Sequence, residues 1–271
     1  MSIDRDVFFE VLGGESAVAT MSDEAKADAL ELFLIESLND QNFLNSPSYL
    51  EEQATFLQSS TPLTRRGTGA IFGDGRREPS ALAPMPERPT LVDFLLLRTS
   101  LPTVRHLLQS ATGALKEGSS EEQILACLLH DLGQSLMKVD HGWWGAQLVE
   151  PYVSDKVSWA IRYHQALRFF PDESVGYSYP ELYVKIYGKD YVPEPYIQEA
   201  YEYARRHPWY MEARMVTVHD LYAFDPDAPV SLDPFVDIIG RNFRQPKEGL
   251  GLDGSAVAHM WRSLIFPDHR L

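Results

Sequence analysis

A histidine next to an aspartate within an apolar run is the feature of this 271-residue chain that most strongly indicates chemistry. His130 and Asp131 stand in the run Leu-Leu-His-Asp-Leu-Gly at positions 128–133. Burying a carboxylate without a partner is expensive, so this placement predicts a bound cation or a strong hydrogen-bonding partner. Adjacent side chains on a helix point about 100° apart, so the two groups can bind one cation, or one can bind while the other bridges to a second. A structural histidine hydrogen-bonded to a capping aspartate gives the same dipeptide.

Further residues with metal-binding side chains lie between positions 100 and 225. The candidate ligands are His106, His130, Asp131, His141, His164 and Asp220. Six ligands suit two metal ions; histidine and carboxylate ligands without thiolates suit iron, manganese or zinc, and the two oxygens of Asp131 can bridge two ions. A core histidine paired with a backbone carbonyl also explains any single histidine of the set. His207, at a predicted helix start, and His219, which points away from its neighbour Asp220, are left out.

Composition excludes several classes of partner. The chain has 24 Lys and Arg against 39 Asp and Glu, for a formal charge of -15. Because no basic run can neutralise several phosphates, we expect neither nucleic acid nor an anionic membrane as partner. The single cysteine, Cys127, cannot form an internal disulfide, which fits the reducing cytoplasm and excludes cysteine-rich zinc or iron–sulfur sites. No window reaches the roughly 18 apolar residues of a membrane span, so we expect a soluble, cytoplasmic protein that binds a small molecule; its oligomeric state is left open.

The length of the chain fits one catalytic domain with an N-terminal extension. We expect residues 1–89 to form a helical extension followed by a Gly/Pro/Arg-rich loop, and residues 90–271 to form the catalytic domain. A helix is predicted at 22–38. The stretch 59–89 lacks periodicity and carries Arg65, Arg66, Arg76 and Arg77. We interpret it as a solvated surface connection, with a lid that brings arginines over an anionic substrate as the alternative.

After residue 90 the spacing of apolar residues predicts helices and no persistent strand pattern, so the expected fold class is all-α. Pro102 suits a first turn, and a helix from there places His106, Gln109 and Gly113 on one face. Ser120 followed three residues later by a glutamine resembles a capping box before a wide apolar surface that reaches residue 136, which predicts a central helix. Further helices are predicted from Ser154 through His164, at 208–223 and near 235–239, and the tail at 261–266 is predicted to pack on the core.

The set of motifs resembles the HD-domain superfamily of all-helical metalloproteins. The stretch His106-Leu107-Leu108-Gln109-Ser110-Ala111, followed by the run at 128–133, is similar to the corresponding run of the HD-domain di-iron oxygenases. That branch includes the inositol and the phosphonate-cleaving oxygenases. Plain HD phosphohydrolases need the first histidine, the His-Asp pair and the late aspartate, whereas the oxygenase branch adds two histidines, which His141 and His164 match. The segments Ile161-Arg162-Tyr163-His164 and Asp220-Leu221-Tyr222 resemble the inositol pattern, and Asp140-His141-Gly142 resembles the phosphonate pattern. The resemblance covers roughly residues 100–225.

This resemblance implies an HD-type helical bundle that holds a mixed-valent Fe(II)/Fe(III) pair. The implied ligands are His106, His130 and Asp220 for one iron, His141 and His164 for the other, and Asp131 as the bridge. It also implies that substrate binds through oxygen atoms at the two-histidine iron, that O2 is the co-substrate, and that a substrate C–H bond is oxidised, with hydroxylation or C–C or C–P cleavage as outcomes. Gln109, one turn after His106, is placed to hydrogen-bond a ligand or the bridging oxygen, which would make it catalytic together with Asp131. A glutamine that only faces the core fits equally well.

Two departures from the family pattern bear on the substrate. Gln134 stands where the inositol enzymes carry a lysine, and Phe224 stands where both branches carry one. We therefore expect a less anionic substrate, apolar or zwitterionic in character, unless Arg65, Arg66 or Arg162 replaces the missing positive charge. The alternative function is a metal-dependent HD phosphohydrolase that acts on a nucleotide or phosphate ester, with metals that activate water instead of O2. A non-catalytic sensor or scaffold that keeps metal for structure is a third hypothesis.

Overall fold

The computed structural model describes Phe9 and residues 14–22, 25–26, 29, 83–137, 140–221, 223, 225 and 228–266. In these ranges the regular elements are helices, and an isolated bridge between Asp172 and Tyr177 is the one β-type pairing. The predicted all-α fold class is therefore confirmed for this part of the chain. No helix of the described ranges combines the length and the apolar character needed to cross a bilayer.

Several predictions fall outside these ranges. They concern most of the helix at 22–38, the four arginines of the irregular stretch, and Phe224. The chain forms two compact units, residues 1–32 with 99–245 and residues 33–98 with 246–271. The predicted domain boundary after residue 89 stays a prediction, because residues 30–82 lie outside the described part.

The second unit contains α6 (Leu91–Leu97) and α15 (Ala258–Ile265). Thr90 begins α6 with a capping box. Trp261 of α15 is fully buried, and its ring packs edge to face on Phe94 with centroids 5.0 Å apart. Arg98 Nε donates to the Ile265 carbonyl oxygen at 2.7 Å. The tail therefore packs into an apolar core, as its aromatic and aliphatic residues predict.

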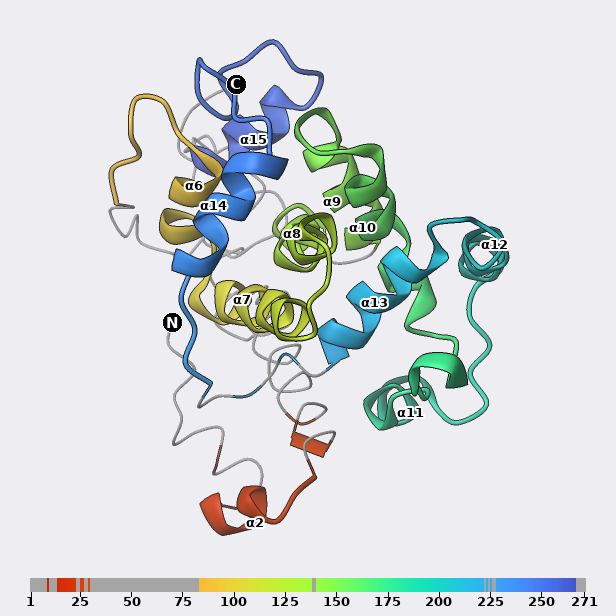
Figure 1. Ribbon diagram of the computed structural model, residues 1–271. Coiled ribbons are helices and arrows are strands. Elements are labelled where there is room, and N and C mark those ends of the chain that lie inside the picture. The colour runs from red at the N-terminus through yellow and green to blue at the C-terminus, as the bar shows by residue number, and fades with distance from the viewer. Residues whose placement is uncertain are drawn as a thin grey trace, which may run out of the picture. The chain divides into compact units, whose positions relative to one another are not determined.

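The first unit contains the remaining helices. They are α2 (Glu15–Ala19), α7 (Leu101–Lys116), α8 (Glu121–Leu129), η1 (Leu132–Ser135), α9 (His141–Val149), η2 (Glu150–Tyr152), α10 (Asp155–Leu167), η3 (Glu173–Val175), α11 (Glu181–Tyr187), α12 (Pro195–Ala204), α13 (Tyr210–Leu221) and α14 (Asp233–Asn242). Helix α8 lies in the middle of Figure 1 and packs against α7, α10, α13 and α14, whereas α9 packs against α10 and η1. Every residue of α8 from Gln123 to Leu129 is buried. The predicted central helix is confirmed.

The helix starts follow the capping signals of the sequence. Ser120 accepts a hydrogen bond from the Gln123 backbone N–H at 3.2 Å and begins α8, and Ser154 accepts one from Val157 at 3.4 Å and begins α10. Pro102 lies in the first turn of α7, where its missing N–H leaves no helical bond unmade. These residues fix where three helices of the bundle, α7, α8 and α10, begin.

The end of α8 differs from the prediction. The apolar run extends to residue 136, but α8 ends at Leu129 and a 3-10 turn follows. Asp131, with φ -99° and ψ 5°, has left the α-helical conformation. The turn packs closely on α9: a Cβ at Gly133 would overlap the His141 carbonyl oxygen and lie 2.6 Å from the Gly145 nitrogen. The His-Asp pair therefore lies at the end of a helix, where the side chains can turn toward α9.

This contact predicts that Gly133→Ala lowers the free energy of unfolding by about 2 to 3 kcal/mol, because the atoms around the new methyl group belong to the backbone and cannot rotate away. Denaturant unfolding of the metal-free protein measures the change. Gly240→Ala is the matched control: it lies in α14 with no atom within 4 Å of the added Cβ, so it should raise stability by about 0.5 to 1 kcal/mol. Equal stabilities of the two variants would contradict this account of η1.

Candidate metal centre

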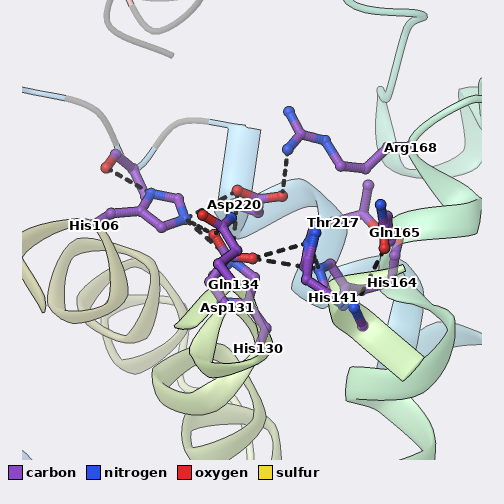
Figure 2. Close-up of polar contacts among 12 residues, drawn as sticks. His106, His130, Asp131, Gln134, His141, His164, Gln165, Arg168, Thr217 and Asp220 are labelled. Carbon is purple, nitrogen blue, oxygen red and sulfur yellow. Dashed lines mark hydrogen bonds and ion pairs between the residues drawn. The ribbon is translucent and has the colours of Figure 1, made fainter. Parts of the chain in front are cut away.

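All six residues predicted as metal ligands lie together in the first unit (Figure 2). They are His106 on α7, His130 directly after α8, Asp131 before η1, His141 at the start of α9, His164 on α10 and Asp220 on α13. Every one of them is buried. Segments up to 114 residues apart in sequence, from His106 to Asp220, thus bring polar groups to one point inside an apolar bundle.

The ligand atoms form two groups that share Asp131. The first group consists of His106, His130, Asp131 and Asp220, and the second of Asp131, His141 and His164. Within each group all ligand atoms lie within 4.8 Å of one another. This is a buried histidine and aspartate cluster that can hold a metal ion. The division into two groups matches the one that the resemblance implies, while the role of each residue as a ligand stays a prediction.

In the first group, His106 Nε2 is the central atom. It lies 3.1 Å from His130 Nε2, 3.1 Å from Asp220 Oδ1 and 3.4 Å from Asp131 Oδ2. His130 Nε2 lies 3.5 Å from the same Asp220 oxygen. Two imidazole nitrogens and oxygens of two carboxylates therefore face a common point.

In the second group, the other oxygen of Asp131 faces two histidines. Asp131 Oδ1 lies 3.1 Å from His141 Nε2 and 3.7 Å from His164 Nε2, and these two nitrogens are 3.3 Å apart. Asp131 thus directs Oδ2 toward His106 and Oδ1 toward the second group, while Oδ1 also lies 3.6 Å from His130 Nε2 (Figure 2). This is the disposition that a bridging carboxylate requires.

Backbone carbonyl groups fix the tautomers of three of the histidines. The Nδ1 atoms of His106, His130 and His164 lie 3.1, 2.8 and 2.6 Å from the carbonyl oxygens of Ala223, Cys127 and Ile161. A carbonyl oxygen only accepts, so each Nδ1 carries the hydrogen and donates it. In the neutral imidazole, Nε2 then presents a lone pair to the cluster, which is the form that binds metal.

The Nε2 contact between His106 and His130 tests whether the cluster fits a cation. Two lone pairs cannot hydrogen-bond to each other, so the 3.1 Å contact needs a proton or a metal ion between the nitrogens. In the metal-free protein the proton lies on His106. Burial lowers the pKa of His106, but hydrogen bonds to Asp131 and Asp220 outweigh burial and raise this pKa to about 10. A cation that replaces this proton satisfies the same lone pairs, so the residues fit a metal ion.

Three other ligands, Asp131, Asp220 and His164, have the protonation states that metal binding requires. Burial alone would raise the pKa of Asp131, but the charges of His130 and His141 hold it well below its usual value. Burial alone would raise the pKa of Asp220, but the charge of Arg168 together with the hydrogen bonds from His106 and His130 holds it well below its usual value. Burial lowers the pKa of His164 to about 4, so its imidazole is neutral at pH 7.

Outer hydrogen-bond partners orient the ligands. Arg168 Nη1 lies 3.0 Å from Asp220 Oδ2, and Gln134 Nε2 donates to Asp131 Oδ2 at 2.7 Å (Figure 2). Such partners fix ligand orientation and affect metal affinity. Arg168 is not among the residues predicted from the sequence, although it follows His164 by four residues, the spacing that places two side chains on one face of a helix. Gln134 stands out in the sequence only as a departure from a family pattern.

Gln109 does not make the predicted contact with a ligand. Its side-chain Nε2 donates to the Asp225 carbonyl oxygen and its Oε1 accepts from the Asp225 N–H, both at 2.8 Å. These two bonds engage both ends of the amide, so the side chain is neither directed at the cluster nor simply packed in the core. The catalytic role predicted for Gln109 stays a prediction.

The two excluded histidines lie outside both groups. The ring of His207 stacks on Trp159 with centroids 4.4 Å apart. His219 Nε2 lies 3.4 Å from Glu117 Oε2. Each has a local partner that accounts for its position.

The cluster is less shielded on one side. The side chains of Asp131 and His141 are 10% and 11% exposed, whereas those of His130 and His164 are fully buried. His106 and Asp220 are 4% and 1% exposed. Solvent therefore reaches the cluster at the three-ligand group, where fewer protein atoms are available to a bound ion.

A scan against protein-family models finds none that matches the chain, and a search of curated proteins finds no similar sequence. A functional assignment therefore depends on the geometry of the cluster and on the motifs that supply its residues.

His141→Ala should remove one metal position and leave the fold intact. We expect the content of tightly bound iron to fall from about two ions per chain to about one, with unchanged helical circular dichroism. Metal analysis after anaerobic Fe(II) loading and desalting measures this. His207→Ala, which removes a histidine outside the cluster, should keep the wild-type iron content. Full occupancy in His141→Ala would refute the role of this residue.

Metal binding should release a proton from His106. Because the pKa of this imidazole is about 10 without metal, the ion competes with a proton at every pH below that value. The apparent affinity should therefore rise about tenfold per pH unit between pH 7 and 9, and about one proton should be released per ion bound at the four-ligand group. Calorimetric titration in buffers of different ionisation enthalpy measures the release. Binding that is independent of pH and releases no proton would contradict the assignment of the proton to His106.

Proposed function

We propose that this protein is an HD-type di-iron oxygenase that oxidises a C–H bond of a small substrate with O2, with hydroxylation or C–C or C–P cleavage as the outcome. The observation that carries the proposal is the shared Asp131, which lies between a four-ligand and a three-ligand group. Ligands of this kind, all nitrogen and oxygen, suit iron. The resemblance to the HD-domain oxygenases in the motifs around His106, His141 and His164 supports the same assignment.

Each residue has a definite task in this proposal. His106, His130 and Asp220 would hold one ion, His141 and His164 the other, and Asp131 would bridge them. When bound, a mixed-valent iron pair supplies O2 activation and one-electron oxidation at the substrate. The three-ligand group leaves more positions for oxygen atoms of a substrate, and it is also the side on which Asp131 and His141 reach solvent.

The protein environment supports this chemistry by holding the ligands still and keeping water away. Fully buried Leu128, Leu129 and Leu132 flank the His-Asp pair. Fixed tautomers and the hydrogen bond from Gln134 to Asp131 reduce the reorganisation needed when charge changes at the cluster. A preorganised site that is largely buried limits side reactions of reactive species.

The substrate that fits best carries less negative charge than those of the two known branches. The neutral amide of Gln134 stands where the inositol enzymes carry a lysine, and it is bonded to Asp131. We propose a small, cytoplasmic substrate that offers oxygen atoms to the three-ligand group and has an apolar or zwitterionic remainder.

A second candidate is an HD phosphohydrolase that acts on a nucleotide or phosphate ester. The four-ligand group by itself contains the residues that such enzymes need, namely His106, His130, Asp131 and Asp220. Metals at these positions would then activate water as the nucleophile. His141 and His164 have no evident task in that reaction, which is why the oxygenase is preferred.

Electron paramagnetic resonance distinguishes the two candidates. Anaerobic Fe(II) loading followed by partial oxidation should give the low-temperature signal of a spin-coupled mixed-valent pair, and His141→Ala should lose it. A spectrum of isolated ions only, together with phosphate release from nucleotides, would replace the oxygenase with the hydrolase.

A further inference from the structure

Gln109 on α7 makes a two-point contact with a backbone segment that lies far away in sequence. Its amide donates to the carbonyl and accepts from the N–H of Asp225, 116 residues later, with both distances 2.8 Å. This pattern is the one by which two residues of neighbouring antiparallel strands pair. Here the Gln109 side-chain amide makes the two hydrogen bonds that a neighbouring strand would make. It thereby fixes both the position and the orientation of the Asp225 peptide groups.

His106, one turn before Gln109, contacts the same segment at a second point. Its Nδ1 donates to the carbonyl oxygen of Ala223 at 3.1 Å, and Ala223 is 1% exposed. The Ala223 N–H in turn donates to the Asp220 carbonyl oxygen at 3.2 Å. Two residues of one helix face therefore hold the chain directly after the ligand Asp220.

His106 differs from the other two histidines whose tautomer is fixed. His130 and His164 donate to carbonyl groups three residues earlier in their own helical turns, Cys127 and Ile161. The helix holds those acceptors in place without further help. The acceptor of His106 lies beyond the end of α13, outside any helix, so its position depends on contacts such as the one from Gln109.

We propose that Gln109 is a positioning residue for the four-ligand group: by binding Asp225 it holds the Ala223 carbonyl oxygen where it accepts the hydrogen bond from His106 Nδ1–H and orients the imidazole ring. The inference rests on the proposed function only in taking His106 as a metal ligand. It assigns Gln109 no contact with substrate or metal. The three-ligand group has no such dependence on Gln109, because His141 and His164 lie on α9 and α10.

The direct test observes the imidazole of His106 without metal. In a histidine ¹⁵N-labelled, metal-free sample, the downfield proton signal of His106 Nδ1 should be present in the wild type and lost or broadened by solvent exchange in Gln109→Ala. Gln109→Glu, which keeps the acceptor for the Asp225 N–H and loses the donor, should show an intermediate exchange rate. The matched control is Gln198→Ala, which removes a glutamine of α12 bonded to the Pro193 carbonyl. A signal unchanged in Gln109→Ala would overturn the proposal.

Metal binding gives a second readout that locates the effect. In a His141→Ala background, which retains the four-ligand group, Gln109→Ala should weaken Co(II) binding about 10- to 100-fold. In a His106→Ala background, which retains the three-ligand group, the same substitution should change the affinity less than about twofold. Equal losses in both backgrounds would indicate general destabilisation and overturn the proposal. Neither readout involves O2 or substrate, so failure of the oxygenase assignment leaves both tests intact.

Discussion

The interaction on which the rest of the structure depends is the compensation of two buried carboxylates. Asp131 and Asp220 are ionised inside an apolar bundle, where an uncompensated charge is prohibitively expensive. Without metal, the charge of Arg168 and a hydrogen bond with His106 stabilise the Asp220 carboxylate, and the neighbouring histidines stabilise the Asp131 carboxylate. A cation bound to the cluster would take over that compensation when His106 gives up its proton. The cluster can therefore be folded with or without metal, because either a proton on His106 or a bound cation compensates the carboxylate charge.

The arrangement of helices serves this compensation. Helix α8 brings the His-Asp pair to the middle of the bundle, and α7, α10 and α13 bring the partners from the elements packed around it. Helix α9 approaches closely because its first turns carry glycines: a Cβ on Gly142 would lie 2.9 Å from the Ile161 carbonyl oxygen of α10. Backbone carbonyl groups then orient the imidazoles of His106, His130 and His164, and Arg168 and Gln134 orient the carboxylates. Each of these ligands is thus held both by the element that carries it and by a hydrogen bond or ion pair from a residue outside the cluster.

The capped, amphipathic helices and the membership of the cluster could be predicted because each depends on local patterns. Ser120 and Ser154 mark helix starts, and the ligands lie on apolar faces. Features that depend on contacts between residues far apart in the sequence could not be predicted. The apolar run does not show that α8 ends at Leu129, and the close approach of Gly133 to α9 cannot be read from the residues around it. Likewise, nothing near Gln109 in the sequence indicates that its partner is Asp225.

The unequal shielding of the two groups has a consequence for how ions enter and leave. His106, His130 and Asp220 are more deeply buried than Asp131 and His141. If each group holds an ion, the ion of the more deeply buried group should exchange with solvent more slowly, because its release requires larger opening motions of the bundle. Mild chelation would then remove the ion next to His141 first.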